Sequence, residues 1–256
     1  DKRGYVKSTE TLGDPGVRAE HLEASDVAFL APELTSEAEG PLRAPERADG
    51  RLGYRFAKRA FDIAFSLAAI AVLLVPSIAL CIAIRVESPG FPIYSQKRVG
   101  RIGRGGEVRT FDMYKFRSMS ADADERLADL AELNEADGPL FKIKDDPRVT
   151  RIGRFIRKHS VDELPQFLNC LMGQLSCVGP RPPLPSEVAQ YDGRAMRRLS
   201  VKPGLTGYWQ VSGRSDTTFD DMVELDLKYI EERSFLVDLR VIAKTVVTML
   251  DGKGAC

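Results

Sequence analysis

Residues 63–84, "IAFSLAAIAVLLVPSIALCIAI", decide the fold class of this chain, because these 22 residues carry no charge and lie between Asp62 and Arg85. As a straight helix the stretch would be about 33 Å long, which is enough to cross a hydrocarbon core of roughly 30 Å. Pro76 lies near its middle, where it removes a backbone donor and clashes with the preceding turn. The stretch therefore predicts a membrane helix that is interrupted at Pro76.

Basic residues flank this apolar run on both sides. Four Lys or Arg lie between residues 51 and 59, and five more lie between residues 85 and 104. The positive-inside rule assigns both ends to the cytoplasm, so it favours a helix that enters the membrane, bends and returns. In such a re-entrant helix the hydroxyl of Ser77 could bond to carbonyls that the break at Pro76 leaves open. A kinked full span and a buried helical hairpin of a soluble protein are the alternatives.

The chain divides into three segments on composition. Residues 1–50 are rich in Glu, Ala, Gly and Pro without a sustained apolar period, which predicts a disordered or loosely ordered tract. Residues 51–88 form the membrane-associated helix with its basic flanks. Residues 89–256 are expected to form a cytosolic domain, so the fold class is α+β, mainly helical, in a monotopic membrane protein.

Local patterns predict the elements of residues 89–256. A short hairpin is expected around residues 103–106, and apolar spacing indicates helices. The expected helices cover residues 121–135, 151–159, 163–172, a segment beginning near residue 219, and 235–250. The last of these has a wide apolar arc, which is typical of a helix at a membrane surface or of one packed against the domain.

Composition narrows the classes of function. The 37 basic and 37 acidic side chains balance, so no global charge favours nucleic acid. Residues 97–117 and 142–158 each hold seven Lys or Arg against two Asp or Glu. These blocks favour an anionic surface or ligand, or they are solvated faces. Aromatic residues beside them are too scattered to stack nucleic-acid bases.

The histidine and cysteine content excludes further classes. The only histidines are His21 and His159, so a His-rich metal site is excluded and a Ser/His/Asp triad could involve only His159. The four cysteines lack metal-ligand spacing. They indicate reduced thiols and a cytosolic compartment for the polar part of the chain.

Two adjacent carboxylates, Asp162 and Glu163, lie in the stretch "KHSVDELPQF", residues 158–167. Pro165 fits best in the first turn of a helix, which places Asp162 at or beside a helix N-terminus. Acidic residues are common helix caps, so the pair alone also fits a structural role.

The surroundings of this pair favour chemistry. Arg157 comes just before it, and Arg181 follows in "VGPRPP", residues 178–183, between prolines that restrict the loop. Cations are expected to lower the pKa of Asp162 and keep it ionised. Asp162 could then bind Mg²⁺ or attack a phosphorus atom, while Glu163 could orient it, bind the metal or move a proton.

Four motifs give the chain a specific resemblance to a known family. They are "FDIAFSLAAIAVLLVPSIAL", "YKFRSM", "DDPRVTRIGRFIRKHSVDELPQFLNCLMGQLSCVGPRP" and "VKPGLTGYWQVSGR". In this order they resemble the bacterial sugar transferases, the monotopic polyprenyl-phosphate phosphoglycosyl transferases that begin exopolysaccharide or O-antigen synthesis. The resemblance covers about residues 54–256 and is nearest to the short hexose-1-phosphate transferases of exopolysaccharide assembly.

The resemblance implies a covalent reaction in two steps. The Asp of the family's Asp-Glu dyad, here Asp162, attacks the β-phosphate of a UDP-sugar and releases UMP. The phosphate of a polyprenyl (undecaprenyl) carrier then displaces the aspartate, with Mg²⁺ assisting and held by Asp162 and Glu163. Lys115, Arg157 and Arg181 match basic positions around the phosphates.

The same resemblance implies the setting of the reaction. Arg214 belongs to a family motif that also serves the phosphates. The re-entrant helix holds the catalytic domain at the cytoplasmic face of the bacterial inner membrane. The family breaks this helix at a Ser-Pro pair, whereas here Val75 precedes Pro76 and Ser77 follows it. UDP-glucose and UDP-galactose both fit as donors. The resemblance leaves open whether the chain also binds a second copy of itself.

Two other classes of function compete with the transferase. A non-catalytic adaptor could bind anionic lipid through the basic blocks, and it would keep its function in Asp162→Asn. A Mg²⁺-dependent phosphohydrolase could act on nucleotide-sugars with water as the acceptor. Product analysis with and without polyprenyl phosphate separates that hydrolase from a transferase.

Overall fold

Helices outnumber strands in the computed structural model, which describes residues 51–103, 106–123, 125–126, 130, 143, 146–212 and 218–251. The expected α+β, mainly helical class is confirmed for these residues. In chain order the elements are α2 (Leu52–Glu87), β1 (Ile93–Val99), β2 (Thr110–Phe116), α3 (Arg151–Lys158), η2 (Val161–Glu163), α4 (Gln166–Met172), β3 (Ser176–Val178), α5 (Pro185–Val188), α6 (Gly193–Met196), η3 (Arg197–Ser200), β4 (Gly204–Thr206), α7 (Tyr208–Val211), α8 (Phe219–Glu232) and α9 (Phe235–Asp251).

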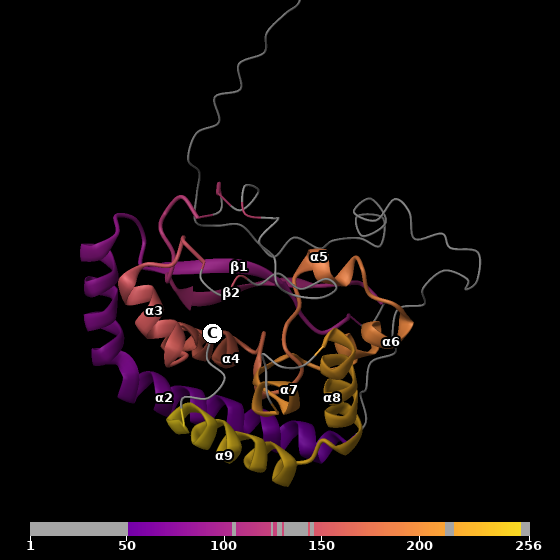
Figure 1. Cartoon of the computed structure of the whole chain (residues 1–256). Coiled ribbons are helices and arrows are strands. Elements are labelled where there is room, and N and C mark those ends of the chain that lie inside the picture. Colours follow the sequence, from indigo (N-terminus) through magenta and orange to yellow (C-terminus); the bar gives the residue numbers. More distant parts are fainter. Residues whose placement is uncertain are drawn as a thin grey trace, which may run out of the picture.

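The apolar run forms one continuous helix rather than two. Helix α2 has 36 residues and contains both Pro76 and Ser77, so the expected break is a bend within a helix. Figure 1 shows α2 following the lower edge of the body and turning up its left-hand side. A proline inside a helix removes one hydrogen bond and bends the axis.

Both ends of α2 are attached to the same body. Near its start, Arg59 donates to two backbone carbonyls of α4, at 2.7 and 2.8 Å, and the Asp62 carboxylate accepts from the backbone of β3 at 2.9 Å. Near its end, Ile84 is buried with Phe116 of β2 and Ile156 of α3. The middle of α2 is exposed, with Val75 at 74%.

Two small sheets complete the body. Strands β1 and β2 pair antiparallel, with Ile93 opposite Phe116, which confirms the expected hairpin. Strands β3 and β4 pair in parallel, with Ser176 opposite Gly204, and no sequence pattern predicted this pair. A Cβ on Gly204 would lie 2.0 Å from the backbone nitrogen of Gly179. Only glycine allows this close approach of the two backbones.

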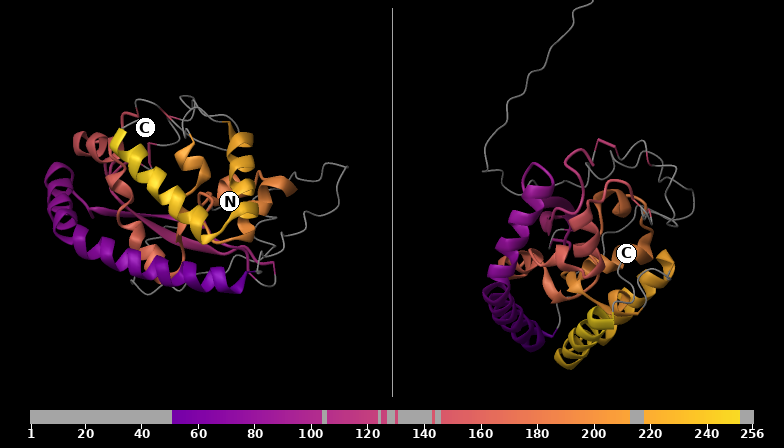
Figure 2. Two further views of the ribbon diagram at one scale, coloured as in Figure 1. Left: turned by 90° about the horizontal axis from the view of Figure 1, so that it is seen from below. Right: turned by 60° about the vertical axis from the view of Figure 1, so that its left-hand side comes forward.

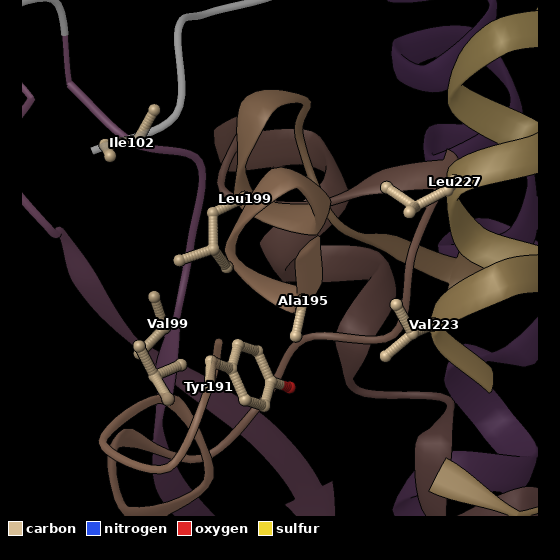
Figure 3. Close-up of a cluster of buried hydrophobic side chains, with 8 residues drawn as sticks. Val99, Ile102, Tyr191, Ala195, Leu199, Val223 and Leu227 are labelled. Carbon is tan, nitrogen blue, oxygen red and sulfur yellow. The ribbon is translucent and has the colours of Figure 1, made fainter. Parts of the chain in front are cut away.

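The largest hydrophobic cluster lies between the end of β1, the short helices α5 and α6, and α8 (Figure 3). Its buried members are Val99, Ile102, Val188, Tyr191, Ala195, Leu199, Val223 and Leu227. Burial of this many side chains, at roughly 25 cal/mol per Å² of apolar surface, is the main term that holds α8 onto the body.

Helices α8 and α9 confirm the two amphipathic helices expected near the end of the chain. At the start of α8, the Thr218 hydroxyl accepts from the backbone N–H of Asp221, and the backbone N–H of Thr218 donates to the Asp221 carboxylate in return. Helix α9 lies beside the first half of α2 (Figure 2), where Phe235 contacts Phe61 edge-on.

One face of helix α9 packs against the body, which is one of the two positions expected for this helix. Asp238 and Val241 are buried there. Its other face exposes apolar side chains, namely Leu236, Leu239, Val246 and Val247. The expected N-terminal tract, most of the expected helix over residues 121–135 and Arg214 lie outside the described residues.

Candidate active site

Asp162 lies in a tight turn between two helices. The turn is the 3₁₀ helix η2, which follows α3, and α4 begins at Gln166 with Pro165 as its cap. The helix start that was expected near Asp162 therefore lies close to the observed start of α4, but the dyad occupies a separate turn just before that helix. Ser160 enters the turn with a φ of 53°, a backbone conformation that is uncommon for a residue with a side chain.

Lys115 of β2 binds both carboxylates of the dyad. Its Nζ atom lies 3.1 Å from Glu163 Oε1 and 3.6 Å from Asp162 Oδ2. Strand β2 is held by β1 across the hairpin and places the lysine over η2. The fold thus brings Lys115 to the adjacent pair Asp162 and Glu163, as the sequence analysis expected of residues around one site.

Burial changes the expected ionisation of Asp162. The residue is only 9% exposed, and burial raises the pKa of its carboxyl group. Lys115 and Arg157 lower that pKa, whereas the neighbouring charge of Glu163 raises it further. The prediction of a lowered pKa was wrong, because the removal of water outweighs the nearby cations.

Arg157 approaches the dyad from α3. Its Nε atom donates to Ser118 Oγ at 2.9 Å, so the guanidinium is held beside β2. Burial lowers the pKa of Arg157, and the charge of Asp162 raises it. The arginine and the aspartate are therefore near enough to affect each other's ionisation.

Arg181 lies in the loop after β3. Its Nη1 atom is 3.3 Å from Glu187 Oε2, and its guanidinium lies over the ring of Trp209, at 5.8 Å from the ring centre. A buried arginine below it, Arg198, donates to its backbone carbonyl at 3.3 Å. The loop is therefore held by packing and by hydrogen bonds, as its prolines predict.

Arg98 of β1 joins the Arg181 loop to the dyad, and sequence analysis missed it. It is 7% exposed and donates to the Pro182 carbonyl at 3.1 Å. Burial lowers its pKa to about 10, the charge of Arg181 lowers it, and the charge of Glu163 raises it. Its Nε atom is buried without a hydrogen-bond partner. Within "QKRVG", residues 96–100, the arginine was counted only as part of a basic block.

The dyad can hold part of a magnesium shell. In the described residues no group of three or more His, Cys, Asp or Glu side chains is placed to bind a metal ion. Mg²⁺ commonly takes one or two carboxylates together with substrate phosphates and water. Asp162 and Glu163 therefore fit as the protein ligands of such an ion, and a phosphate substrate would supply further oxygens.

Comparison with known proteins identifies relatives of this chain. Residues 53–252 match the family described as bacterial sugar transferase. The chain is 45% identical over 207 residues to the galactosyl transferase CpsE of Streptococcus agalactiae serotype III, covering 80% of this chain and 44% of that protein. It is 41% identical over 211 residues to the undecaprenyl-phosphate galactose phosphotransferase of Salmonella typhimurium, covering 78% and 42%.

A shorter relative matches over most of its length. The exopolysaccharide production protein ExoY of Rhizobium meliloti is 37% identical over 205 residues, covering 78% of this chain and 88% of that protein. The chain spans less than half the length of the first two relatives and most of the third.

Proposed function

The chain belongs to the bacterial sugar transferase family, and on that basis we propose that it transfers a hexose-1-phosphate from a UDP-sugar to polyprenyl phosphate. The observation that carries the proposal is the Asp162–Glu163 pair in a buried turn, bound by Lys115. Relatives that act on this class of carrier include proteins named for undecaprenyl phosphate and galactose or N-acetylgalactosamine. The product would be the first lipid-linked intermediate of an exopolysaccharide or O-antigen.

The first step is attack on phosphorus by Asp162. One carboxylate oxygen forms a bond to the β-phosphorus of the UDP-sugar, and the bond from that phosphorus to the bridging oxygen breaks. UMP leaves with the electron pair, and the sugar phosphate remains on Asp162 as an acyl phosphate. Lys115 and Arg157 support this step because they lower the pKa of a carboxyl group that burial holds high.

The second step restores the aspartate. A phosphate oxygen of the polyprenyl carrier attacks the same phosphorus, and the carboxylate of Asp162 leaves. The positive charges of Lys115, Arg157 and Arg181 offset the charge that builds up on the transferred phosphoryl group. Mg²⁺, held by Asp162 and Glu163 with substrate oxygens, would supply further charge neutralisation. Arg214 is proposed to assist at the phosphates.

We place α2 in the membrane as a re-entrant helix. Its apolar stretch is long enough to span a membrane by length and composition, and only 6% of that stretch is buried inside the structure. Both ends of α2 contact one body, which supports a helix that returns to the side it came from. That side is proposed to be the cytoplasm, with the dyad near the inner leaflet, where a soluble donor can meet a lipid acceptor.

One experiment tests the covalent route. The full chain in detergent is incubated with labelled UDP-sugar and no acceptor, and its intact mass is measured. A sugar-phosphate adduct that maps to Asp162 and disappears on adding polyprenyl phosphate is expected. A panel with UDP-glucose and UDP-galactose identifies the sugar. Release of free sugar phosphate without any lipid product would indicate a hydrolase, and a sequential rate law without an adduct would make Asp162 a metal ligand only.

A further inference from the structure

Arg181 contacts a buried carboxylate, that of Glu187, to which the proposed reaction gives no role. The Nη1 atom of Arg181 lies 3.3 Å from both carboxylate oxygens of Glu187. The side chain of Glu187 is 2% exposed, whereas that of Arg181 is 26% exposed. A ligand can therefore reach the guanidinium of Arg181 from solvent, while the carboxylate that holds it stays inside the protein.

A helix cap explains only part of the contacts of this carboxylate. Glu187 lies in the short helix α5, and its Oε2 atom accepts from the backbone N–H of Leu184 at 3.1 Å, as acids in a first helical turn often do. That bond needs one acceptor oxygen and no charge. A buried carboxylate is costly unless it is paired. The contact with Arg181 through both oxygens is the one that offsets this cost.

The charge of Glu187 also affects a second arginine, Arg98. Arg98 donates to the Pro182 carbonyl at 3.1 Å, so it contacts the residue that follows Arg181. Burial lowers the pKa of Arg98 and the charge of Arg181 lowers it further, whereas the charge of Glu187 raises it. Glu187 thus opposes the repulsion between the two guanidinium groups.

Two further contacts fix the position of Arg181. Arg198 donates to its backbone carbonyl at 3.3 Å, and its guanidinium lies over the ring of Trp209, 5.8 Å from the ring centre. Trp209 is the only tryptophan in the chain. A cation over an indole ring interacts with its π-electrons, so the fluorescence of Trp209 reports the position of Arg181 in the absence of any substrate.

We propose that Glu187 is a positioning residue, which holds the guanidinium of Arg181 near Arg98 as a preformed site for the phosphates of the nucleotide-sugar donor. Glu187 acts through Arg181 and does not touch the donor. An arginine that is held in place before the donor arrives loses less side-chain entropy on binding. The inference rests on the proposed function, because it takes the donor phosphates as the ligand of Arg181.

The emission of Trp209 tests the position of Arg181 with no substrate present. The full chain is measured in detergent. Arg181→Gln removes the cation over the ring and gives the reference emission. Glu187→Gln keeps an oxygen for the Leu184 backbone but loses the charge that holds Arg181. Its emission should therefore move from the wild-type value toward that of Arg181→Gln, and an emission equal to that of the wild type would overturn the proposal.

A double-mutant cycle tests whether Glu187 acts through Arg181. The probe is UDP, and its binding is measured by calorimetry. Arg181→Gln should weaken UDP binding by about tenfold, as expected for the loss of one charge-assisted contact, and Glu187→Gln by at least about threefold. The double variant should bind UDP no more weakly than Arg181→Gln alone, because Glu187 then has no arginine to position. Losses that multiply in the double variant would overturn the proposal.

Matched variants separate this role from general charge and from folding. Glu224→Gln removes an acid from an exposed ion pair with Arg194, at 3.5 Å, and should leave both the emission and UDP binding unchanged. Glu187→Asp is the second variant, should Glu187→Gln fold poorly. It keeps the charge but withdraws the carboxylate by one methylene, so the emission should move in the same direction. A chain that binds no UDP would contradict the proposed function, and the emission series would still decide whether Glu187 positions Arg181.

Discussion

The carboxyl group of Asp162 experiences opposing influences at the scale of single residues. Burial and the charge of Glu163 raise its pKa, while Lys115 and Arg157 lower it. A nucleophile held this way is poorly solvated when ionised, which increases its reactivity, yet it depends on its cations to be ionised at all. In the proposed reaction, Lys115 would therefore keep the attacking carboxylate charged as well as bind phosphate.

Removal of the nucleophile should abolish the reaction. In Asp162→Asn we expect UMP release and lipid-linked product to fall by at least about a thousandfold, because an amide does not attack phosphorus. Asp162→Glu should fail almost as badly, since one extra methylene displaces the attacking oxygen. Release of UMP from labelled UDP-sugar measures both. Asp220→Asn, an exposed acid on α8, serves as the control, and transfer that survives in Asp162→Asn would exclude the covalent route.

The pH dependence should report the contact between Lys115 and the dyad. Only the carboxylate form attacks, so the rate falls as pH falls through the pKa of Asp162. Lys115 lowers that pKa, so Lys115→Met should move the acid limb of the kcat/KM profile to higher pH. We also expect about a hundredfold loss of activity at neutral pH.

Lys97→Met is the matched control for this profile. Lys97 forms a 3.3 Å ion pair with Asp112 on the exposed side of the same hairpin. Its removal should leave the profile in place. An unshifted acid limb in Lys115→Met would mean that the lysine has no part in the ionisation of Asp162.

At the scale of elements, a buried ion pair joins η3 to α8 beneath the Arg181 loop. Arg198 and Asp226 are both buried and lie 2.7 Å apart, and Arg198 also contacts the Tyr191 hydroxyl and the Arg181 carbonyl. Arg198 thus positions the loop that carries Arg181 by binding its backbone.

Breaking this pair should destabilise the fold. Asp226→Ala leaves the charge of Arg198 buried and unpaired, which costs about 3–5 kcal/mol of unfolding free energy. Chemical denaturation in detergent measures the change. Glu224 lies on the same helix as Asp226 and forms an exposed ion pair with Arg194 of α6 at 3.5 Å. Glu224→Ala should change stability by less than about 0.5 kcal/mol. Equal effects in the two variants would contradict this account of the buried pair.

At the scale of the whole molecule, α2 joins the body at both of its ends and leaves its middle exposed. The bend of α2 in Figure 1 turns its second half back along the body, so that both ends contact it. The arrangement ties the position of the dyad to α2 through α4, whose backbone accepts from Arg59. It also gives α9, with its exposed apolar face, a place beside α2.

Labelling of single cysteines should place both ends of α2 on one side of the membrane. In a background without the native cysteines, Arg55→Cys and Lys97→Cys should react with an impermeant maleimide only when the cytoplasmic face is accessible. Asp220→Cys marks the side of the body. Reaction of the two sites from opposite sides would establish a span, and Pro76→Leu should shift some molecules toward that outcome by straightening the helix.

The local patterns of the chain determined its elements and the members of its dyad. The apolar run of α2, the hairpin, α8 and α9 follow from periodicity and from glycine and proline positions, because these signals act within a few residues. Asp162 and Glu163 could be singled out because they are adjacent and lie among cations. The parallel pairing of β3 with β4 could not be found this way, since its two strands are too short to carry a pattern.

Only the tertiary structure determines which of these residues lie close enough to affect one another. The pKa direction of Asp162 depends on how completely β2, α3 and α4 exclude water from it, and sequence shows charges but not burial. Arg98 is buried and bonded to the Arg181 loop, and the charge of Glu163 raises its pKa, only because the fold brings these segments together. Arg59 and Lys202, which are far apart in the chain, likewise line one cavity between α2 and the segment before β4. Desolvation and long-range charge interactions depend on distances in space, and those distances are set when the chain packs.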